Sequence, residues 1–151
     1  IFLIFSFFTF YELSINYVSM IPLFICISTD VGGYVFGKIF KGPKLTKISP
    51  KKTYSGMIGS YILSIITIYI LFIYSYLYND IIVKFTSETF LIVLLISTVS
   101  QIGDIIISFF KRLSKIKDTG KIIPGHGGLL DRIDGMIFAF PFSYIIFSLN
   151  I

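Results

Sequence analysis

Five polar residues recur at helical spacing inside an otherwise apolar segment. Ser97, Gln101, Asp104, Ser108 and Lys111 follow one another at intervals of four, three, four and three residues. At about 3.6 residues per turn they share one face of a helix. A carboxylate that faces lipid is costly, so this face must lie against other helices or a wet cavity. Hydrogen bonds between helices would account for the Ser and Gln side chains, whereas an intramembrane Asp marks a candidate functional site.

Acidic and basic residues gather in the same parts of the chain. Five of the eight acidic residues lie close in sequence to basic clusters: Asp30, Asp104, Asp118, Asp131 and Asp134. Mg²⁺ takes one or two carboxylates together with phosphate oxygens, and Lys and Arg neutralise the remaining phosphate charge. The pattern therefore predicts a site for a metal-bound polyphosphate. For the lysines at 41, 44 and 47, contact with anionic lipid headgroups is an equally good interpretation.

Composition indicates that membrane helices position these residues. The chain is 55% hydrophobic and 14% charged, against roughly one quarter charged in soluble domains. About 20 apolar residues cross a hydrocarbon core of roughly 30 Å. The sequence therefore predicts an all-α, polytopic bundle that forms a single membrane domain over residues 1–151. We expect spans at about 13–34, 56–78 and 88–110, and a fourth of marginal length at 135–151.

The basic residues predict the topology. Twelve of the 13 lie in two segments, 35–55 and 111–134, which two predicted spans separate. Both segments should therefore lie on one side of the membrane, and the positive-inside rule makes that side cytoplasmic. We expect a multi-pass protein of a bacterial inner membrane with its active-site loops in the cytoplasm. Because the chain opens in the middle of an apolar run, we expect it to be the C-terminal portion of a longer chain.

Residues 108–134 carry a dense motif, S-F-F-K-R-L-S-K-I-K-D-T-G-K-I-I-P-G-H-G-G-L-L-D-R-I-D. It resembles the signature of the phosphatidate cytidylyltransferase (CDP-diacylglycerol synthase) family: Ser, Lys-Arg, Lys-Asp-x-Gly, Pro-Gly-His-Gly-Gly and Asp-Arg-x-Asp. Segments 30–38, 44–45, 49–53 and 101–104 resemble further motifs of that family, so the resemblance runs from about residue 28 to the end. The chain departs from the pattern at Gly33, usually alanine, at Ile107, commonly glutamate, and at Tyr54-Ser55, usually an aromatic residue followed by Glu.

The resemblance implies an enzyme in which phosphatidic acid attacks the α-phosphorus of CTP, giving CDP-diacylglycerol and pyrophosphate. The lipid phosphate supplies the attacking oxygen, so no protein nucleophile is needed. The implied cofactor is Mg²⁺, with a second, monovalent cation as an addition to test. The expected partners are CTP, phosphatidic acid, membrane lipid and a second copy of the chain in a homodimer, and no nucleic acid.

The resemblance also implies roles for individual residues. The expected metal ligands are Asp104, Asp131 and Asp134, which are also counted as catalytic. The other expected catalytic residues are Ser108, Lys111, Arg112, Asp118, His126 and Arg132. The expected substrate contacts are Asp30, Lys38, Ser49, Lys51, Lys52, Thr53, Lys117, Gly125, Gly127 and Gly128. Simpler interpretations stay open for the glycines, as a tight turn entering the last helix, and for the serine at 108, in helix packing.

Two other functions are compatible with parts of the pattern. One is a truncated or degenerate member of the family without activity. The other is a fragment of a membrane transporter that uses Asp30 and Asp104 as ion sites. A transporter predicts polar residues through the depth of the membrane, whereas here the acids gather at one face and segment 56–78 carries no charge.

Overall fold

The computed structural model describes residues 2–15, 20–46, 49, 52–77, 85–116 and 133–149. These residues form the helices α1 (Phe2–Ile15), α2 (Met20–Phe40), α3 (Tyr54–Leu77), α4 (Ser87–Leu113) and α6 (Met136–Ser148). Within the same residues the only β-structure is an isolated bridge between Lys44 and Thr53. The helices α2, α3 and α4 are long and apolar enough to cross a membrane. The prediction of an all-α membrane bundle is therefore confirmed.

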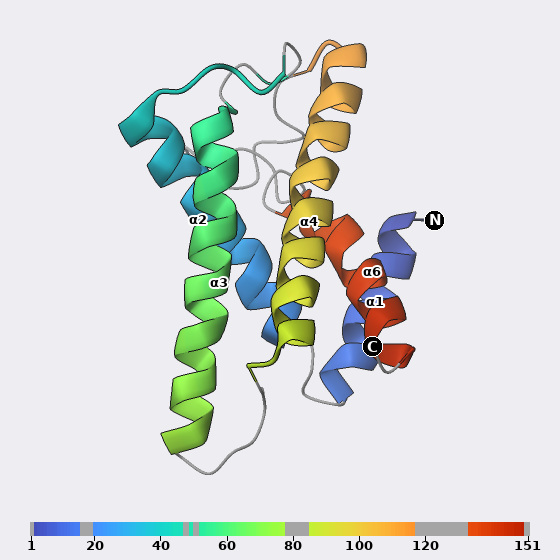
Figure 1. The fold of residues 1–151 in the computed structure, drawn as a ribbon. Coiled ribbons are helices and arrows are strands. Elements are labelled where there is room, and N and C mark those ends of the chain that lie inside the picture. The colour runs from blue at the N-terminus through green and yellow to red at the C-terminus, as the bar shows by residue number, and fades with distance from the viewer. Residues whose placement is uncertain are drawn as a thin grey trace, which may run out of the picture.

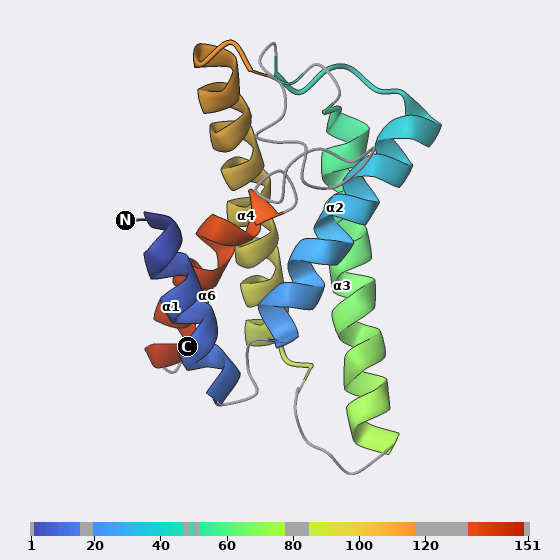
Figure 2. The same cartoon turned by 180° about the vertical axis from the view of Figure 1, so that it is seen from behind.

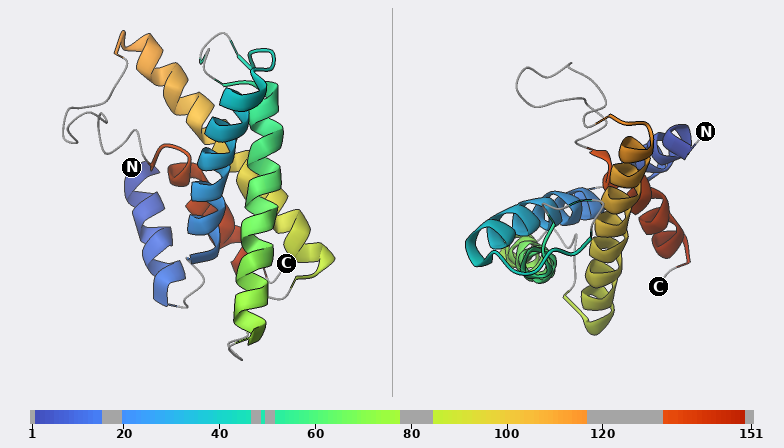
Figure 3. Two further views of the ribbon diagram at one scale, coloured as in Figure 1. Left: turned by 90° about the vertical axis from the view of Figure 1, so that its left-hand side faces the viewer. Right: turned by 90° about the horizontal axis from the view of Figure 1, so that it is seen from above.

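The helix α4 stands between two pairs of helices. The pair α2–α3 lies on one side of α4 and the pair α1–α6 on the other, as the view from above shows (Figure 3). The C-terminal ends of α2 and α4 and the N-terminal end of α3 lie together at one end of the bundle (Figure 1). Lys41 directly follows α2 and Lys115 lies two residues after α4, so both are at this end, which we call the basic end. The predicted spans imply this alternation of helix directions.

Two helix boundaries differ from those expected. The span predicted at 13–34 takes in the end of α1, and α2 itself continues to Phe40. Glu12, Ser14 and Asn16 interrupt the apolar run near this boundary, and the prediction placed the last two inside a single span. At the other end α6 has 13 residues, which is about 20 Å of helix and less than the hydrocarbon thickness.

Glycines let α2 and α3 approach closely. A Cβ atom on Gly32 would lie 2.6 Å from the carbonyl oxygen of Gly59 and 2.9 Å from the Cα of Ser60. The hydroxyl of Ser60 donates a buried 2.6 Å hydrogen bond to the carbonyl oxygen of Thr29. In lipid, where helices gain little from the hydrophobic effect, such packing and hydrogen bonding drive association. The approach of α2 to α3 thus depends on residues without bulky side chains.

We expect Gly32→Ala to destabilise the bundle by about 1–3 kcal/mol, the usual cost of overpacking. Its methyl group would meet backbone atoms of α3, which cannot rotate away. Unfolding in detergent, followed by circular dichroism, measures the effect.

Gly33→Ala is the matched control, because the nearest atom to its methyl would be the Ser60 hydroxyl at 3.0 Å. Both changes gain the same helix propensity. Equal stability of the two variants would contradict the close packing at Gly32.

Candidate active site

We call the five polar residues of α4 at positions 97, 101, 104, 108 and 111 the polar stripe. In the lower part of α4 in Figure 1, this stripe faces α2. Ser97 is fully buried, and its hydroxyl shares a 3.0 Å hydrogen bond with the hydroxyl of Thr29. The side-chain amide of Gln101 donates to the same Ser97 oxygen at 3.4 Å. Ser97 therefore lies against α2, which agrees with its interpretation as a contact between helices.

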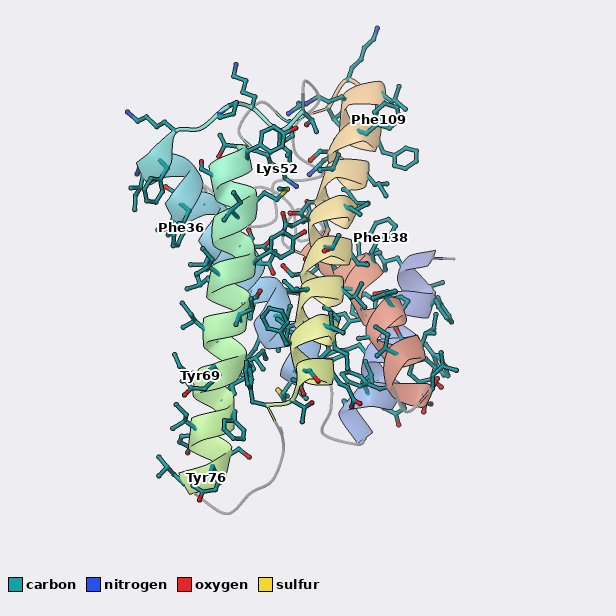
Figure 4. The ribbon with its side chains drawn as sticks, in the orientation of Figure 1. Phe36, Lys52, Tyr69, Tyr76, Phe109 and Phe138 are labelled. Carbon is teal, nitrogen blue, oxygen red and sulfur yellow. The ribbon has the colours of Figure 1, made fainter. Side chains whose placement is uncertain are left out.

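Above these bonds the stripe lines a cavity of about 220 Å³ between α2, α3, α4 and the segment that joins α2 to α3. We call it the polar cavity. It brings together five of the predicted site residues: Asp30, Ser49, Lys52, Thr53 and Asp104. Two backbone hydrogen bonds hold the joining segment, from Leu45 N–H to Lys52 oxygen at 2.8 Å and from Tyr54 N–H to Pro43 oxygen at 3.0 Å. They fix the position from which Lys52 enters the space between α3 and α4 (Figure 4).

An ion pair closes the inner side of the polar cavity. The Lys52 Nζ lies 3.1 Å from Asp104 Oδ2. The other carboxylate oxygen, Asp104 Oδ1, is shielded from water and has no hydrogen-bond partner among the residues that the structure describes. A buried, unpaired carboxylate oxygen is costly. This oxygen is therefore placed to accept a cation or a hydrogen-bond donor from a ligand.

A second ion pair lies on the other side of Asp104. The Lys111 Nζ is 3.6 Å from Asp134 Oδ2, and both side chains are largely buried. The backbone N–H of Gly135 donates to Asp134 Oδ1 at 3.1 Å. A Cβ atom on Gly135 would lie 2.6 Å from Ser100 Oγ and 2.9 Å from Asp104 Oδ1, so the start of α6 directly abuts α4. This contact brings the carboxylate of Asp134 next to that of Asp104.

The carboxylate of Asp104 opposes the ionisation of its neighbour Asp134. The pKa of Asp134 is raised to about 8, chiefly by burial and next by the nearby Asp104, while Lys111 acts in the opposite direction. Two carboxylates share a site comfortably when a proton or a cation lies between them. Among the described residues no group of three His, Cys, Asp or Glu side chains forms a metal site, but two carboxylates are a sufficient protein contribution for Mg²⁺.

The raised pKa predicts how stability depends on pH in chelator-treated protein. Between the usual value of 3.8 and about 8, the folded protein keeps a proton on Asp134 that the unfolded chain releases. The free energy of unfolding should therefore fall as pH rises across this window and level off above it. Thermal unfolding in detergent with EDTA measures the slope. Asp134→Asn should flatten it, and an unchanged slope in that variant would contradict the assignment.

Besides Lys111 and Asp134, three further predicted residues do not line the polar cavity. Lys38 is exposed on the last turn of α2, with its Nζ 5.6 Å from the centre of the Tyr34 ring. Ser108 is half-buried on α4. Arg112 is exposed near the end of α4, where its guanidinium donates to the Ile116 carbonyl oxygen at 3.5 Å. None of the three lines the polar cavity.

The remaining predicted residues lie outside the described part of the chain. They are Lys51, Lys117, Asp118, Gly125, His126, Gly127, Gly128, Asp131 and Arg132. Their roles stay predictions.

The polar cavity also includes residues for which the sequence predicts no role. They are Thr29, Gly33, Tyr34, Leu45, Gly56, Met57 and Ser60. Small or polar residues four apart, Thr29 with Gly33 on α2 and Gly56 with Ser60 on α3, share a helix face. That spacing was a signal for a lined cavity, but it is equally typical of close helix packing.

Comparison with known proteins identifies one family. The profile of the Cytidylyltransferase family matches residues 1–150. A phosphatidate cytidylyltransferase of Rickettsia typhi is 40% identical over 136 residues, which cover 87% of this chain and 58% of that protein. Proteins of the same name from Haemophilus influenzae and Staphylococcus saprophyticus are 40% and 38% identical, over 85% and 78% of this chain. The aligned regions cover 45% and 44% of those two proteins, so the chain spans about half the length of these relatives.

Proposed function

Because the chain belongs to the Cytidylyltransferase family, we propose that it transfers a cytidylyl group from CTP to phosphatidic acid. The products are CDP-diacylglycerol and pyrophosphate. The observation that carries the proposal is the pair of adjacent carboxylates, Asp104 and Asp134, each in an ion pair with a lysine beside a cavity among membrane helices. The names of the relatives supply the substrates.

The reaction calls for positioning rather than a protein nucleophile. The phosphate oxygen of phosphatidic acid attacks the α-phosphorus of CTP, and the bond to the β-phosphate bridging oxygen breaks to release pyrophosphate. The protein has to hold two polyanions together and stabilise the charge of the leaving group. Lys52 and Lys111 are suited to this task, because each can exchange its carboxylate partner for a phosphate oxygen. Ser49 and Thr53 lie beside Lys52 and can donate hydroxyl hydrogen bonds to the nucleotide.

The carboxylates fit a divalent cation. Asp104 and Asp134 would hold Mg²⁺, with Asp131 as a further expected ligand, and Asp104 Oδ1, which has no hydrogen-bond partner among the described residues, is a suitable ligand atom. When bound, Mg²⁺ would neutralise phosphate charge and orient the triphosphate. Binding of a second, monovalent cation to the same carboxylates is a separate proposal.

The remaining features of the proposal concern the cell. The basic end of the bundle would face the cytoplasm of a bacterium, following the positive-inside rule. CTP would reach the site from that side, and phosphatidic acid from the inner membrane around it. A homodimer remains an expectation from the family resemblance.

The test is incorporation of label from CTP into lipid. The purified chain, reconstituted with phosphatidic acid, CTP labelled at the α-phosphate and Mg²⁺, should yield organic-soluble label, whereas label in the γ-phosphate should stay in water. Absence of lipid label from folded protein, even after the upstream helices of a longer relative are added, would contradict the transferase function. It would leave the interpretation as a degenerate family member.

A further inference from the structure

A second cavity, of about 190 Å³, lies between α1, α2 and α6. We call it the apolar groove. Apart from Ser6 its lining is apolar, with Phe7 and Phe10 from α1, Leu23 from α2, and Met136 and Phe140 among the residues from the α6 side. The helices α1 and α6 lie side by side here (Figure 2).

The groove is lined by Ile133 and Met136, which flank Asp134 in the sequence. Asp134 forms an ion pair with Lys111, so the groove lies beside the segment that carries this pair. The groove is closed further down, where the rings of Phe10 and Phe140 meet edge to face with centroids 4.9 Å apart. On the α1 side Leu3 and Phe7 are 39% and 55% exposed, so the groove opens on the outer surface of the described helices.

These features match an amphiphile with an anionic head. From Met136 to Phe140 the helix rises about 6 Å, less than half of one leaflet of a hydrocarbon core roughly 30 Å thick. The groove therefore has room only for the part of one acyl chain nearest the headgroup. A lipid chain gains little affinity on moving from bilayer to groove, since both are apolar. The groove would instead fix where the headgroup sits.

We propose that the apolar groove receives the headgroup-proximal part of one acyl chain of phosphatidic acid, with its phosphate at Lys111, while the nucleotide occupies the polar cavity. The inference rests on the proposed function and adds a division of the site between the polar cavity and the apolar groove. Asp104 links the two, because it lines the polar cavity and its Oδ1 lies against Gly135, next to the groove residue Met136. The attacking phosphate and the triphosphate would thus reach the carboxylates from two different cavities.

Photocrosslinking tests the groove without turnover. The chain in bilayers receives phosphatidic acid that carries a diazirine close to the ester end of one acyl chain, and labelled peptides are mapped by mass spectrometry. We expect label on α1 and α6, competed by unlabelled phosphatidic acid and not by glycerol 3-phosphate. Label spread over the lipid-facing surfaces of α2, α3 and α4 would overturn the proposal.

Ser6→Leu supplies the matched variant. Ser6 lines the groove and is 5% exposed, so the larger side chain should lower labelling of α1 and α6 by about tenfold, as extra methyl groups do in a fitted pocket. Ile4→Phe is an enlargement on the same helix at a residue that is 72% exposed and outside the groove, and it should leave labelling unchanged. Should Ser6→Leu not fold, Leu23→Phe narrows the groove from α2. Unchanged labelling in a folded narrowing variant would overturn the proposal.

The outcomes separate this inference from the transferase function. An inactive chain that labels in the groove would overturn the enzymatic proposal alone. An active chain in which the label falls outside α1 and α6 would overturn the groove proposal alone.

Discussion

Asp104→Asn should lower transfer of label from CTP to phosphatidic acid by about 100-fold or more, the usual scale for removing one electrostatic stabiliser from an active site. The substitution keeps the size of the side chain and removes its charge. It deletes the partner of Lys52 and half of the carboxylate pair with Asp134. The nucleotide phosphates would then lose a cation site, while the polar cavity would keep its shape. Initial rates at saturating CTP and Mg²⁺ measure the effect.

Glu88→Gln is the matched control. It makes the same change from carboxylate to amide on the same helix, at an exposed position in the first turn of α4. Its activity should stay within a few-fold of the unmodified chain, since surface charges far from a site contribute little. Full activity of Asp104→Asn would show that this residue has no role in the reaction. Equal losses of activity in both variants would indicate a general effect of charge on folding.

The fold was largely predictable because long apolar segments, which can be read directly from the sequence, determine most of its helices. Long apolar runs identify α2, α3 and α4, and the clustering of basic residues predicts that the ends of α2 and α4 lie together. The boundary between α1 and α2 was missed although Glu12, Ser14 and Asn16 interrupt the apolar run there, because single polar residues also occur inside membrane helices.

The site was predictable in its components and less so in its arrangement. The periodicity of α4 indicates that Asp104 faces inward, and the family motifs single out Lys52 and Asp134. The pairing of each carboxylate with a particular lysine depends on how the joining segment and the start of α6 meet α4, which no periodicity encodes. The contact at Gly135 is an example, since its importance comes from atoms of α4 that lie more than 30 residues away in the sequence.

Lys52→Met should lower kcat/KM for CTP by about 100-fold, comparable to the loss of other charged groups that stabilise a transferred phosphoryl group. The Lys52 side chain is 28% exposed and its ammonium group pairs with Asp104 across the polar cavity. Methionine keeps most of the length and apolar stem and removes the charge. If the ammonium group moves from Asp104 to a phosphate oxygen as CTP binds, its loss should raise KM and lower kcat. Lys52→Arg keeps the charge and should recover part of the loss. Steady-state kinetics with varied CTP measures both parameters.

Lys41→Met tests whether the loss is specific to the polar cavity. Lys41 lies in the same joining segment and is exposed, with a positive φ of 45° that the substitution leaves equally strained. If basic residues of this segment act only through the anionic membrane surface, the two methionine variants should lose activity alike and regain it with more anionic lipid. If Lys52 binds the nucleotide, its loss should persist at every lipid composition while Lys41→Met stays active. The comparison separates a residue that contacts substrate from one that follows the general charge asymmetry of membrane proteins.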